Sequence, residues 1–376
     1  MGLWFSASAV TPTLVDNWHL SINGVVWLTA AVQVGFVAGA IGSAALNLSD
    51  RFAPERVLAA SSLAGAMATI VFATVAHGFW AAIPLRLLTG VALAGVYPTG
   101  MSILASWFSN GRALAFGLMI AALAVGSGSP HLLAGIHALP ATAVLLAAAG
   151  IAVGGAAIAL LFVREGPLGA VAPPFEPRYA LRMVRDRSQR LITLAYAGHM
   201  WELYALWTWI PAFLSAWFVD RSSALSPWLV GLATFGMVAV AGAAGSVVAG
   251  VSAERAGSAG VAKVALATSA LCCLLSTVLF GGSVWWLIVL ITVWGASALA
   301  DSAQFSFILS EAADRRYIGT ALTLQTAFGF AVTVVTIQVL PYVADVVGWR
   351  LTPLVLAVGP ALGLWAMIRM SRTAAP

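Results

Sequence analysis

Long apolar stretches, separated by short segments that hold most of the charged residues, run through the whole sequence. Most are about 20 to 25 residues long, enough for a helix to cross the roughly 30 Å of hydrocarbon in a bilayer. The pattern predicts twelve membrane-spanning helices, the first of them short, at residues 1–14, 22–46, 57–76, 80–104, 113–133, 140–163, 191–214, 227–251, 261–281, 284–309, 320–343 and 350–369.

The polar segment 164–190 separates these helices into two sets of six, and the two sets repeat. Three pairs of charged residues lie 204 residues apart along the chain, namely Asp50 and Glu254, Arg51 and Arg255, and Arg112 and Arg316. Coincidences at a single offset indicate an internal duplication, as in many secondary transporters. We therefore expect an all-α membrane protein of two pseudo-symmetric six-helix bundles, 1–163 and 191–376, joined by a loop at 164–190.

Charged side chains are too few for a soluble protein of this size. The sequence has 18 Lys and Arg and 13 Asp and Glu, and 61% of its residues are hydrophobic; its mean hydropathy is +0.97. A soluble domain could not cover its surface with so few charges, so the predicted surroundings are a lipid bilayer. The net charge of +5 then reflects arginines in loops, and no nucleic-acid partner is expected.

The basic residues fall almost entirely on one predicted side of the membrane. If successive loops alternate sides, the outside keeps only Arg221 and Arg350, and the side of segment 164–190 holds fifteen, which are Arg51, Arg56, Arg112, Arg164, Arg178, Arg182, Arg185, Arg187, Arg190, Arg255, Lys263, Arg315, Arg316, Arg369 and Arg372. An excess of Lys and Arg marks cytoplasmic loops. Both termini and segment 164–190 are therefore expected in the cytoplasm, in a multi-pass protein of the inner (plasma) membrane.

The loops after the second and eighth spans resemble those of the major facilitator superfamily, a family of secondary transporters. The family pattern Gly-x-Leu-Ala-Asp-Arg-x-Gly-Arg is matched by Gly250, Ala253, Glu254, Arg255 and Gly257, with Glu in place of Asp. The first half matches less closely, and "RLLTGVALAGVYP" contributes Arg86 and Gly90 to the family's Arg-x-x-x-Gly pattern. The resemblance covers essentially the whole chain and implies two helix bundles that alternate access to a central site.

Charged residues of these loops are candidates for a cytoplasmic gate. A carboxylate at the positive N-terminal end of a neighbouring helix, paired with an arginine, would hold the cytoplasmic side closed. By pseudo-symmetry we expect Asp50 near the start of the eleventh span and Glu254 near the start of the fifth; alternatively, the charges only set the topology. The candidates are Asp50, Arg51, Arg56, Arg112, Glu254, Arg255, Arg315 and Arg316.

Ionisable residues within the spans are the candidates for proton coupling, because a charge at membrane depth needs a partner, water or a function. His199 and Glu202 lie three residues apart in the seventh span, and Glu202 falls roughly 16 Å into the membrane at 1.5 Å per residue. Glu202 would bind and release a proton, with His199 relaying it or fixing the carboxyl group. Alternatively, Glu202 is a protonated acid bonded to a neighbouring helix. Asp301 in the tenth span is the third candidate.

Other polar and aromatic residues in the spans are candidates for binding the solute. The 204-residue offset places Asp301 opposite Tyr97, and Arg86 would bind an anionic group or pair within its own half. The glutamines either line a cavity or join helices, and the aromatic residues beside Glu202 either shape a pocket or face lipid. The predicted substrate-binding set is Arg86, Gln33, Tyr97, Trp201, Tyr204, Gln304 and Gln325.

Nucleotide and metal chemistry is not expected. No G-x-x-x-x-G-K-[ST] run is present, and segment 164–190 is too short for a nucleotide-binding domain. The spacing of His199 and Glu202 is one that metal sites use, but no further ligands accompany the pair. We expect no enzyme activity, no cofactor and no metal, so the energy for transport would come from an ion gradient or from the solute gradient.

The first twenty residues begin in the middle of a predicted helix. Shifted back by 204 residues, the seventh span predicts a first span that starts before Met1, and no basic residue precedes Arg51 as a signal peptide would require. We therefore expect Met1 to lie within a first helix whose cytoplasmic part is absent from this sequence.

Together these features predict a monomeric secondary transporter of a small organic solute, working by alternating access and coupled to protons. Arg86 and the loop "ASWFSNGRALAFGL" favour an anionic solute. One alternative is a proton-driven exporter of drugs or metabolites, for which Gly117 and Gly126 form a partial signature. The second is a transporter-like sensor that moves nothing.

Overall fold

A computed structural model of the chain shows an all-helical protein. It describes residues 1–46, 51–108, 111–136, 139–168, 176–219 and 226–371, and no strand occurs among them. The helices are α1 (Gly2–Ala9), α2 (Thr11–Trp18), α3 (Ile22–Ala45), α5 (Pro54–Val75), α6 (Phe79–Leu93), α7 (Tyr97–Trp107), α8 (Arg112–Gly135), α9 (Ala141–Phe162), α10 (Tyr179–Arg185), α11 (Arg187–Val219), α12 (Pro227–Phe235), the π-helix η1 (Gly236–Ala241), α13 (Gly242–Ala256), α14 (Ser258–Leu279), α15 (Val284–Ala300), α16 (Ser302–Ala312), the 3₁₀ turn η2 (Arg315–Tyr317), α17 (Ile318–Leu351) and α18 (Pro353–Ser371).

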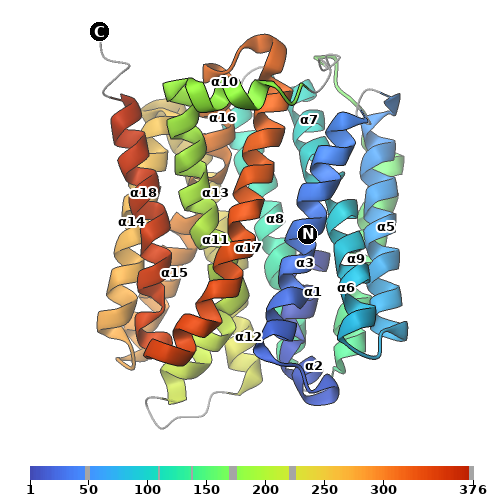
Figure 1. Cartoon of the computed structure of the whole chain (residues 1–376), viewed down its shortest axis with the longest axis vertical. Coiled ribbons are helices and arrows are strands. Elements are labelled where there is room, and N and C mark those ends of the chain that lie inside the picture. The colour runs from blue at the N-terminus through green and yellow to red at the C-terminus, as the bar shows by residue number, and fades with distance from the viewer. Residues whose placement is uncertain (47–50, 109–110, 137–138, 169–175, 220–225, 372–376) are drawn as a thin grey trace.

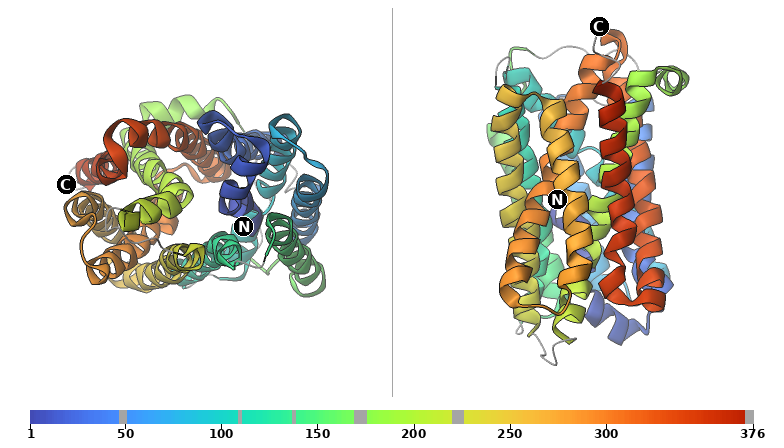
Figure 2. Two further views of the ribbon diagram at one scale, coloured as in Figure 1. Left: turned by 90° about the horizontal axis from the view of Figure 1, so that it is seen from below. Right: turned by 90° about the vertical axis from the view of Figure 1, so that its left-hand side faces the viewer.

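The long helices run side by side, and α10 lies across one end of them (Figures 1 and 2). In the described part of the chain, ten helical segments are long and apolar enough to cross a membrane. The two predicted spans outside these ten are 1–14, where α1 has 8 residues, and 191–214, which α11 covers with 33 residues that include His199 and Glu202. Ten of the twelve predicted spans thus have apolar helices, and the two-bundle organisation stays a prediction.

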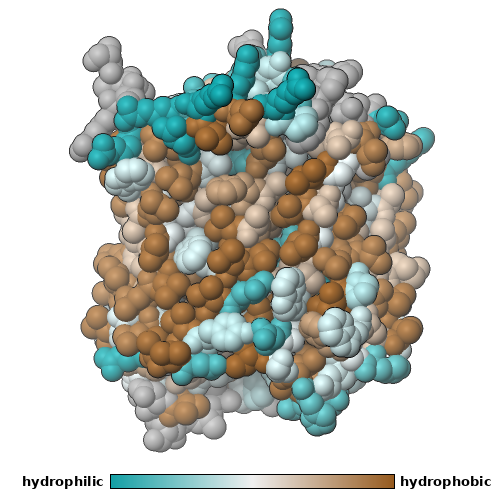
Figure 3. Space-filling model, viewed as in Figure 1, coloured by the Kyte–Doolittle hydropathy of each residue, from teal (hydrophilic) through white to brown (hydrophobic). Residues whose placement is uncertain are grey.

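The surface agrees with a protein that sits in lipid. Apolar residues cover the middle of the face in Figure 3, and polar residues gather at the end that carries α10. Five of the exposed tryptophans stand near the starts of helices that begin at the opposite end, namely Trp27, Trp80, Trp228, Trp285 and Trp286. Tryptophan is enriched where a membrane meets water.

Four predicted spans are interrupted. The first ends at Ala9, and α2 begins with Pro12 near its start, where a residue without a backbone N–H is tolerated. The spans predicted at 80–104 and 284–309 each break into two helices, α6 with α7 and α15 with α16. The span at 227–251 contains η1, and π-bulges of this kind are frequent at functional sites.

Glycines allow close backbone contact between helices that are distant in sequence. A Cβ atom placed on Gly90 of α6 would lie 2.1 Å from the carbonyl oxygen of Val32 in α3, and one on Gly35 of α3 would lie 2.1 Å from that of Leu87. Between the predicted halves, α3 packs against α17 and α8 packs against α12, η1 and α13. A Cβ on Gly117 of α8 would lie 2.7 Å from the carbonyl oxygen of Ser246 in α13.

Candidate functional site

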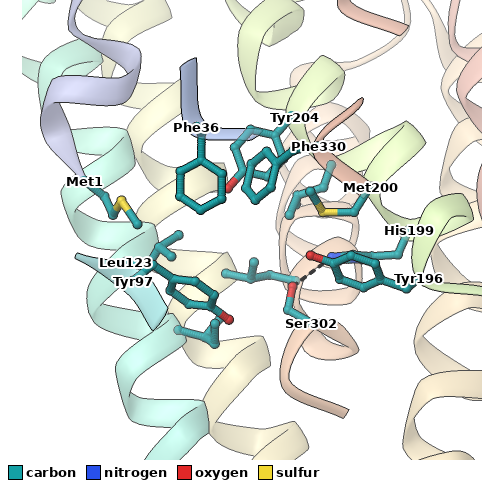
Figure 4. Close-up of a pocket in the computed structure, with 13 residues that line it drawn as sticks. Met1, Phe36, Tyr97, Leu123, Tyr196, His199, Met200, Tyr204, Ser302 and Phe330 are labelled. Carbon is teal, nitrogen blue, oxygen red and sulfur yellow. Dashed lines mark hydrogen bonds between the residues drawn. The ribbon is translucent and has the colours of Figure 1, made fainter. Parts of the chain in front are cut away.

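A small cavity lies where helices of the two predicted halves meet (Figure 4). Its volume is about 30 Å³, which is room for one or two water molecules. No Lys, Arg, Asp or Glu is among the described residues that line it, which are Met1, Phe36, Tyr97, Ile120, Leu123, Tyr196, His199, Met200, Leu203, Tyr204, Leu299, Ser302 and Phe330.

Aromatic rings from four helices meet beside the cavity. Phe330 of α17 lies 4.3 Å from Phe36 of α3, 5.0 Å from Trp4 of α1 and 5.0 Å from Tyr204 of α11, measured between ring centroids. Trp4 also contacts Phe36 and Tyr204, at 5.1 and 5.3 Å. Exposed fractions of these four residues are 6% or less. We call Trp4, Phe36, Tyr204 and Phe330 the aromatic cluster; it fills the space between α3 and α11.

His199 is held between two consecutive residues at the break between α15 and α16. Its Nδ1 lies 2.8 Å from Oδ1 of Asp301, and its Nε2 lies 2.9 Å from Oγ of Ser302. Asp301 and Ser302, at the junction of α15 and α16, therefore contact opposite nitrogens of one imidazole ring.

His199 and Asp301 lie within ion-pair distance of each other. Both side chains are 2% exposed, and Oδ1 of Asp301 has no hydrogen bond of good geometry with any described residue. Imidazole is the side chain that commonly changes its charge near neutral pH. His199 and Ser302 line the cavity, whereas Asp301 contacts His199 from outside the described lining.

Glu202 belongs to a different network. Its Oε1 accepts hydrogen bonds from Ser269 Oγ at 2.6 Å, Trp294 Nε1 at 2.7 Å and Cys273 Sγ at 3.3 Å. These donors lie on α14 and α15, and Glu202 does not line the cavity. The geometry therefore corresponds to the second sequence interpretation, a carboxyl group bonded to neighbouring helices.

Arg86 is buried within the first half. Its Nε, Nη1 and Nη2 donate to the carbonyl oxygens of Leu28, Leu3 and Trp4, at 3.2, 3.0 and 2.6 Å. The guanidinium also lies over the ring of Phe72, 5.7 Å from its centroid. These contacts join α6 to α1 and α3, and Arg86 is not among the residues that line the cavity.

The remaining predicted binding residues divide between the cavity and the helix contacts. Tyr97 and Tyr204 line the cavity. Gln33 has the orientation that lets it donate to the carbonyl of Thr29 and accept from Trp4 Nε1 at 3.1 Å. Trp201 donates to the carbonyl of Val355 in α18 at 2.8 Å.

Two further glutamines of the predicted set are buried away from the cavity lining. Gln304 is 2% exposed and Gln325 is 1% exposed. Both amide atoms of Gln325 lack a hydrogen-bond partner among the described residues.

Several cavity residues escaped the sequence analysis. Ser302 directly follows Asp301, and Tyr196 stands one helical turn before His199. Their positions beside two predicted ionisable residues are the sequence signal that could have identified them. Phe36, Met200 and Phe330 carry no polar signal and resemble any other apolar residue of a membrane helix. Only their packing identifies them.

The predicted gate lies partly outside the described residues, because Asp50 and the side chain of Arg315 are not among them. Oε1 of Glu254 lies 4.0 Å from a Cβ atom placed on Gly111, the residue that precedes α8. Arg112 instead donates to the carbonyl oxygens of Phe108 and Ala105, at 2.5 and 3.2 Å. Within the described part of the chain, no ion pair joins the remaining gate candidates, which are Arg51, Arg56, Arg255 and Arg316.

Comparison with known proteins agrees with this architecture. The family model described as Major Facilitator Superfamily matches residues 1–329. No curated protein shows a significant match to the sequence. The matched region holds α1 to α16, the His199 network and every described cavity-lining residue except Phe330, and it covers most of the 376 residues. The chain therefore belongs to the major facilitator superfamily of membrane transporters.

Proposed function

We propose that this protein moves a small organic solute across the membrane by alternating access, and that the movement is coupled to a proton bound at His199. The observation that carries the proposal is the position of His199. Its ring lines the cavity between the two predicted halves, and its two nitrogens contact Asp301 and Ser302. A residue that can change its charge therefore meets the space through which a solute would pass.

The packing between the predicted halves supports alternating access. Helix α3 contacts α17, and α8 contacts α13, across the two predicted halves. Glycines on α8 and α13 bring the two backbones close together, so few side chains interlock at their interface. The cavity is too small for an organic solute in this arrangement. Binding therefore requires the halves to separate on one side, and the aromatic cluster is the barrier on the path.

The proposed proton site differs in detail from the set Glu202, His199 and Asp301. In this proposal His199 and Asp301 hold the proton, because among the described residues their network reaches the cavity wall and that of Glu202 does not. Glu202 fixes α11 against α14 and α15 through its three hydrogen bonds. Arg86, bonded to three carbonyls, positions α1 and does not contact the solute.

The membrane arrangement follows from the charge distribution. We place twelve spans in two bundles, with α1 and α11 as the first and seventh, and with the arginine-rich end and both termini in the cytoplasm of a plasma membrane. Glu254, near the end of α13 and close to the start of α8, forms half of the cytoplasmic gate, and Asp50 would form the symmetric half. An anionic solute stays an expectation from the sequence, and the described cavity lining holds no Arg or Lys side chain.

Transport by the purified protein tests the proposal directly. Proteoliposomes that contain a pH-sensitive dye would be exposed to small acids and cationic drugs, with and without a pH gradient, and solute uptake would be measured by mass spectrometry. We expect solute uptake in the wild type that changes with the pH gradient, and uptake without this pH dependence in His199→Gln. Solute uptake indifferent to pH in both proteins would refute coupling at His199, and uptake identical to that of empty liposomes for every solute would refute transport.

A further inference from the structure

The hydroxyl group of Ser302 stands between His199 and the cavity. Its Oγ lies 2.9 Å from Nε2 of His199, and either atom can be the donor. Ser302 also lines the cavity, as Figure 4 shows. The direction of this hydrogen bond therefore decides whether the hydroxyl group offers a solute its hydrogen as a donor or only its oxygen as an acceptor.

The charge of His199 sets that direction. A protonated imidazole has two N–H donors, so Nδ1–H points to Asp301 and Nε2–H donates to Ser302. The serine hydrogen is then free to donate into the cavity. A neutral imidazole whose proton stays on Nδ1, beside Asp301, has a lone pair at Nε2 and accepts the serine hydrogen. The oxygen of Ser302 then presents only acceptor lone pairs to the cavity.

The net charge of the His199 and Asp301 pair also changes when His199 gains or loses a proton. With His199 protonated, the imidazolium and the Asp301 carboxylate form a neutral pair. With His199 neutral, the carboxylate has no positive partner in this network, and an isolated charge at membrane depth is costly. A cation that entered the cavity would supply the missing charge.

Other charged and titratable groups lie near His199, and they include the α-amino group of Met1, a residue that also lines the cavity. Glu202, on the same helix, is a second carboxyl group and cannot attract an anion. On α6, Arg86 directs its three donors at carbonyl oxygens. Tyrosines 97, 196 and 204 add neutral hydroxyl groups to the wall, and Cys272 and Cys273 lie on α14, with Cys273 bonded to Glu202.

The rest of the wall suits the apolar body of such a cation. Rings of Phe36, Tyr97, Tyr196, Tyr204 and Phe330 line the cavity. Aromatic faces attract cations and stack on flat apolar groups. An anion would meet the same rings with an unfavourable charge and without an arginine or lysine in the described lining.

We propose that the solute is a small organic cation with an apolar or aromatic body and at least one N–H donor, and that Ser302 selects it by accepting this hydrogen when His199 is neutral. The inference rests on the proposed function and names its substrate class. One proton leaves His199 for water when the cation binds, and a proton that returns to His199 turns Ser302 into a donor and expels the cation. The exchange conserves the charge of the site.

Four compounds of similar shape separate the features of the solute. Benzylguanidine is a cation with N–H donors, benzyltrimethylammonium is a cation without them, benzylurea is a neutral donor, and phenylmethanesulfonate is an anion. Binding to the detergent-solubilised protein would be measured by thermal shift and calorimetry at pH 5.5 and pH 8. Exchange would be measured in proteoliposomes that contain a pH-sensitive dye.

We expect benzylguanidine to bind about tenfold more tightly at pH 8 than at pH 5.5, and to release close to one proton per protein when it binds at pH 5.5. The quaternary cation should bind more weakly, and the neutral and anionic compounds weakest. Ser302→Ala should reduce the preference for benzylguanidine over benzyltrimethylammonium at least fivefold, with the pH dependence retained. Ser310→Ala, on the same helix and bonded to the carbonyl of Phe307, should behave as the wild type.

The possible failures are distinguishable. If phenylmethanesulfonate binds best and its transport depends on His199, the cation class is wrong while proton-coupled transport stands. If no cation binds at either pH, the substrate class is also wrong. If Ser302→Ala keeps the full preference for the N–H donor, the selective role of Ser302 is wrong. Solute transport that ignores pH in the wild type contradicts the proposed function itself.

Discussion

His199 and Glu202 lie one turn apart on α11, and their side chains belong to separate hydrogen-bond networks. His199 contacts Asp301 and Ser302 beside the cavity, whereas Glu202 contacts Ser269, Cys273 and Trp294 between helices. Three residues correspond to about 300° of rotation at 3.6 residues per turn, so the two side chains point about 60° apart. That angle is enough to direct them into different helix interfaces.

The separation predicts different consequences for the two residues. His199→Gln should abolish the pH dependence of transport and reduce proton-linked uptake at least tenfold, because an amide does not titrate. Glu202→Gln should retain pH-dependent transport, since the amide oxygen still accepts from the three donors. Transport assays between pH 5.5 and pH 8 on both variants compare them directly. Loss of pH dependence in Glu202→Gln, with His199→Gln unaffected, would reverse the assignment.

Glu202→Leu should destabilise the protein more than Glu202→Gln. Leucine leaves the donors of Ser269 and Trp294 unpaired in a buried site, at a cost of about 1–3 kcal/mol for each donor. A drop in Tm of the leucine variant, measured by thermal shift in detergent, checks this expectation. Equal Tm values for the two variants would mean that the hydrogen bonds contribute little to the packing of α11.

Gly90→Ala should prevent the close contact of α3 and α6. Its new methyl group would lie 2.1 Å from the carbonyl oxygen of Val32, and neither backbone can move aside without disturbing its helix. We expect a loss of folded yield and a Tm lower by several degrees, since overpacking costs about 1–3 kcal/mol or more. Gly154→Ala on α9 is the matched control, because nothing lies within 4 Å of its added carbon. Similar yields for the two variants would contradict the close packing.

Phe330→Ala should open the barrier beside the cavity. The ring contacts Trp4, Phe36 and Tyr204, and its removal enlarges the space between α3 and α11. We expect a lower Tm and a slow uncoupled leak of solute or protons across proteoliposome membranes. Phe328→Ala, on the same helix but 50% exposed, should show neither effect. A tight, fully coupled Phe330→Ala protein would remove the aromatic cluster from the transport path.

Arg86→Lys should affect stability rather than solute selection. Three nitrogens of one planar group reach carbonyl oxygens on α1 and α3, and a single ammonium group cannot reproduce that fork. We expect a reduced Tm, with the ranking of transported solutes unchanged. The opposite result, a stable protein that loses an anionic solute, would favour the substrate-binding interpretation of Arg86.

Glu254→Gln tests the cytoplasmic gate. The carboxylate lies near Gly111 at the start of α8, where it is favoured by the partial positive charge of the helix. The amide should weaken the closed cytoplasmic side, so that cysteine probes placed there react faster and transport slows severalfold. Glu55→Gln, in the first turn of α5, is the comparison variant. Unchanged cysteine reactivity in Glu254→Gln would contradict the gate and would mean that the charge of Glu254 only sets the membrane topology.

The sequence alone determined the helical class and the approximate positions of ten apolar spans of this protein. Hydrocarbon thickness sets the length of a spanning helix. Lipid-exposed loops and open sheet edges are excluded, because their backbone N–H and C=O groups would lack hydrogen-bond partners in lipid. The 204-residue repeat related Asp301 to Tyr97, and both lie close to the cavity, since Tyr97 lines it and Asp301 contacts the lining residue His199. These properties depend on local composition and on the order of residues along the chain.

Tertiary structure decided which polar groups meet. The spacing of His199 and Glu202 suggested a common face, but the break at Asp301 brings Asp301 and Ser302 to His199 and leaves Glu202 to α14 and α15. Arg86 likewise found carbonyl oxygens on two other helices. Partners of a buried polar group depend on the rotation and breaks of helices distant in sequence, and hydropathy and repeats carry no information about those angles.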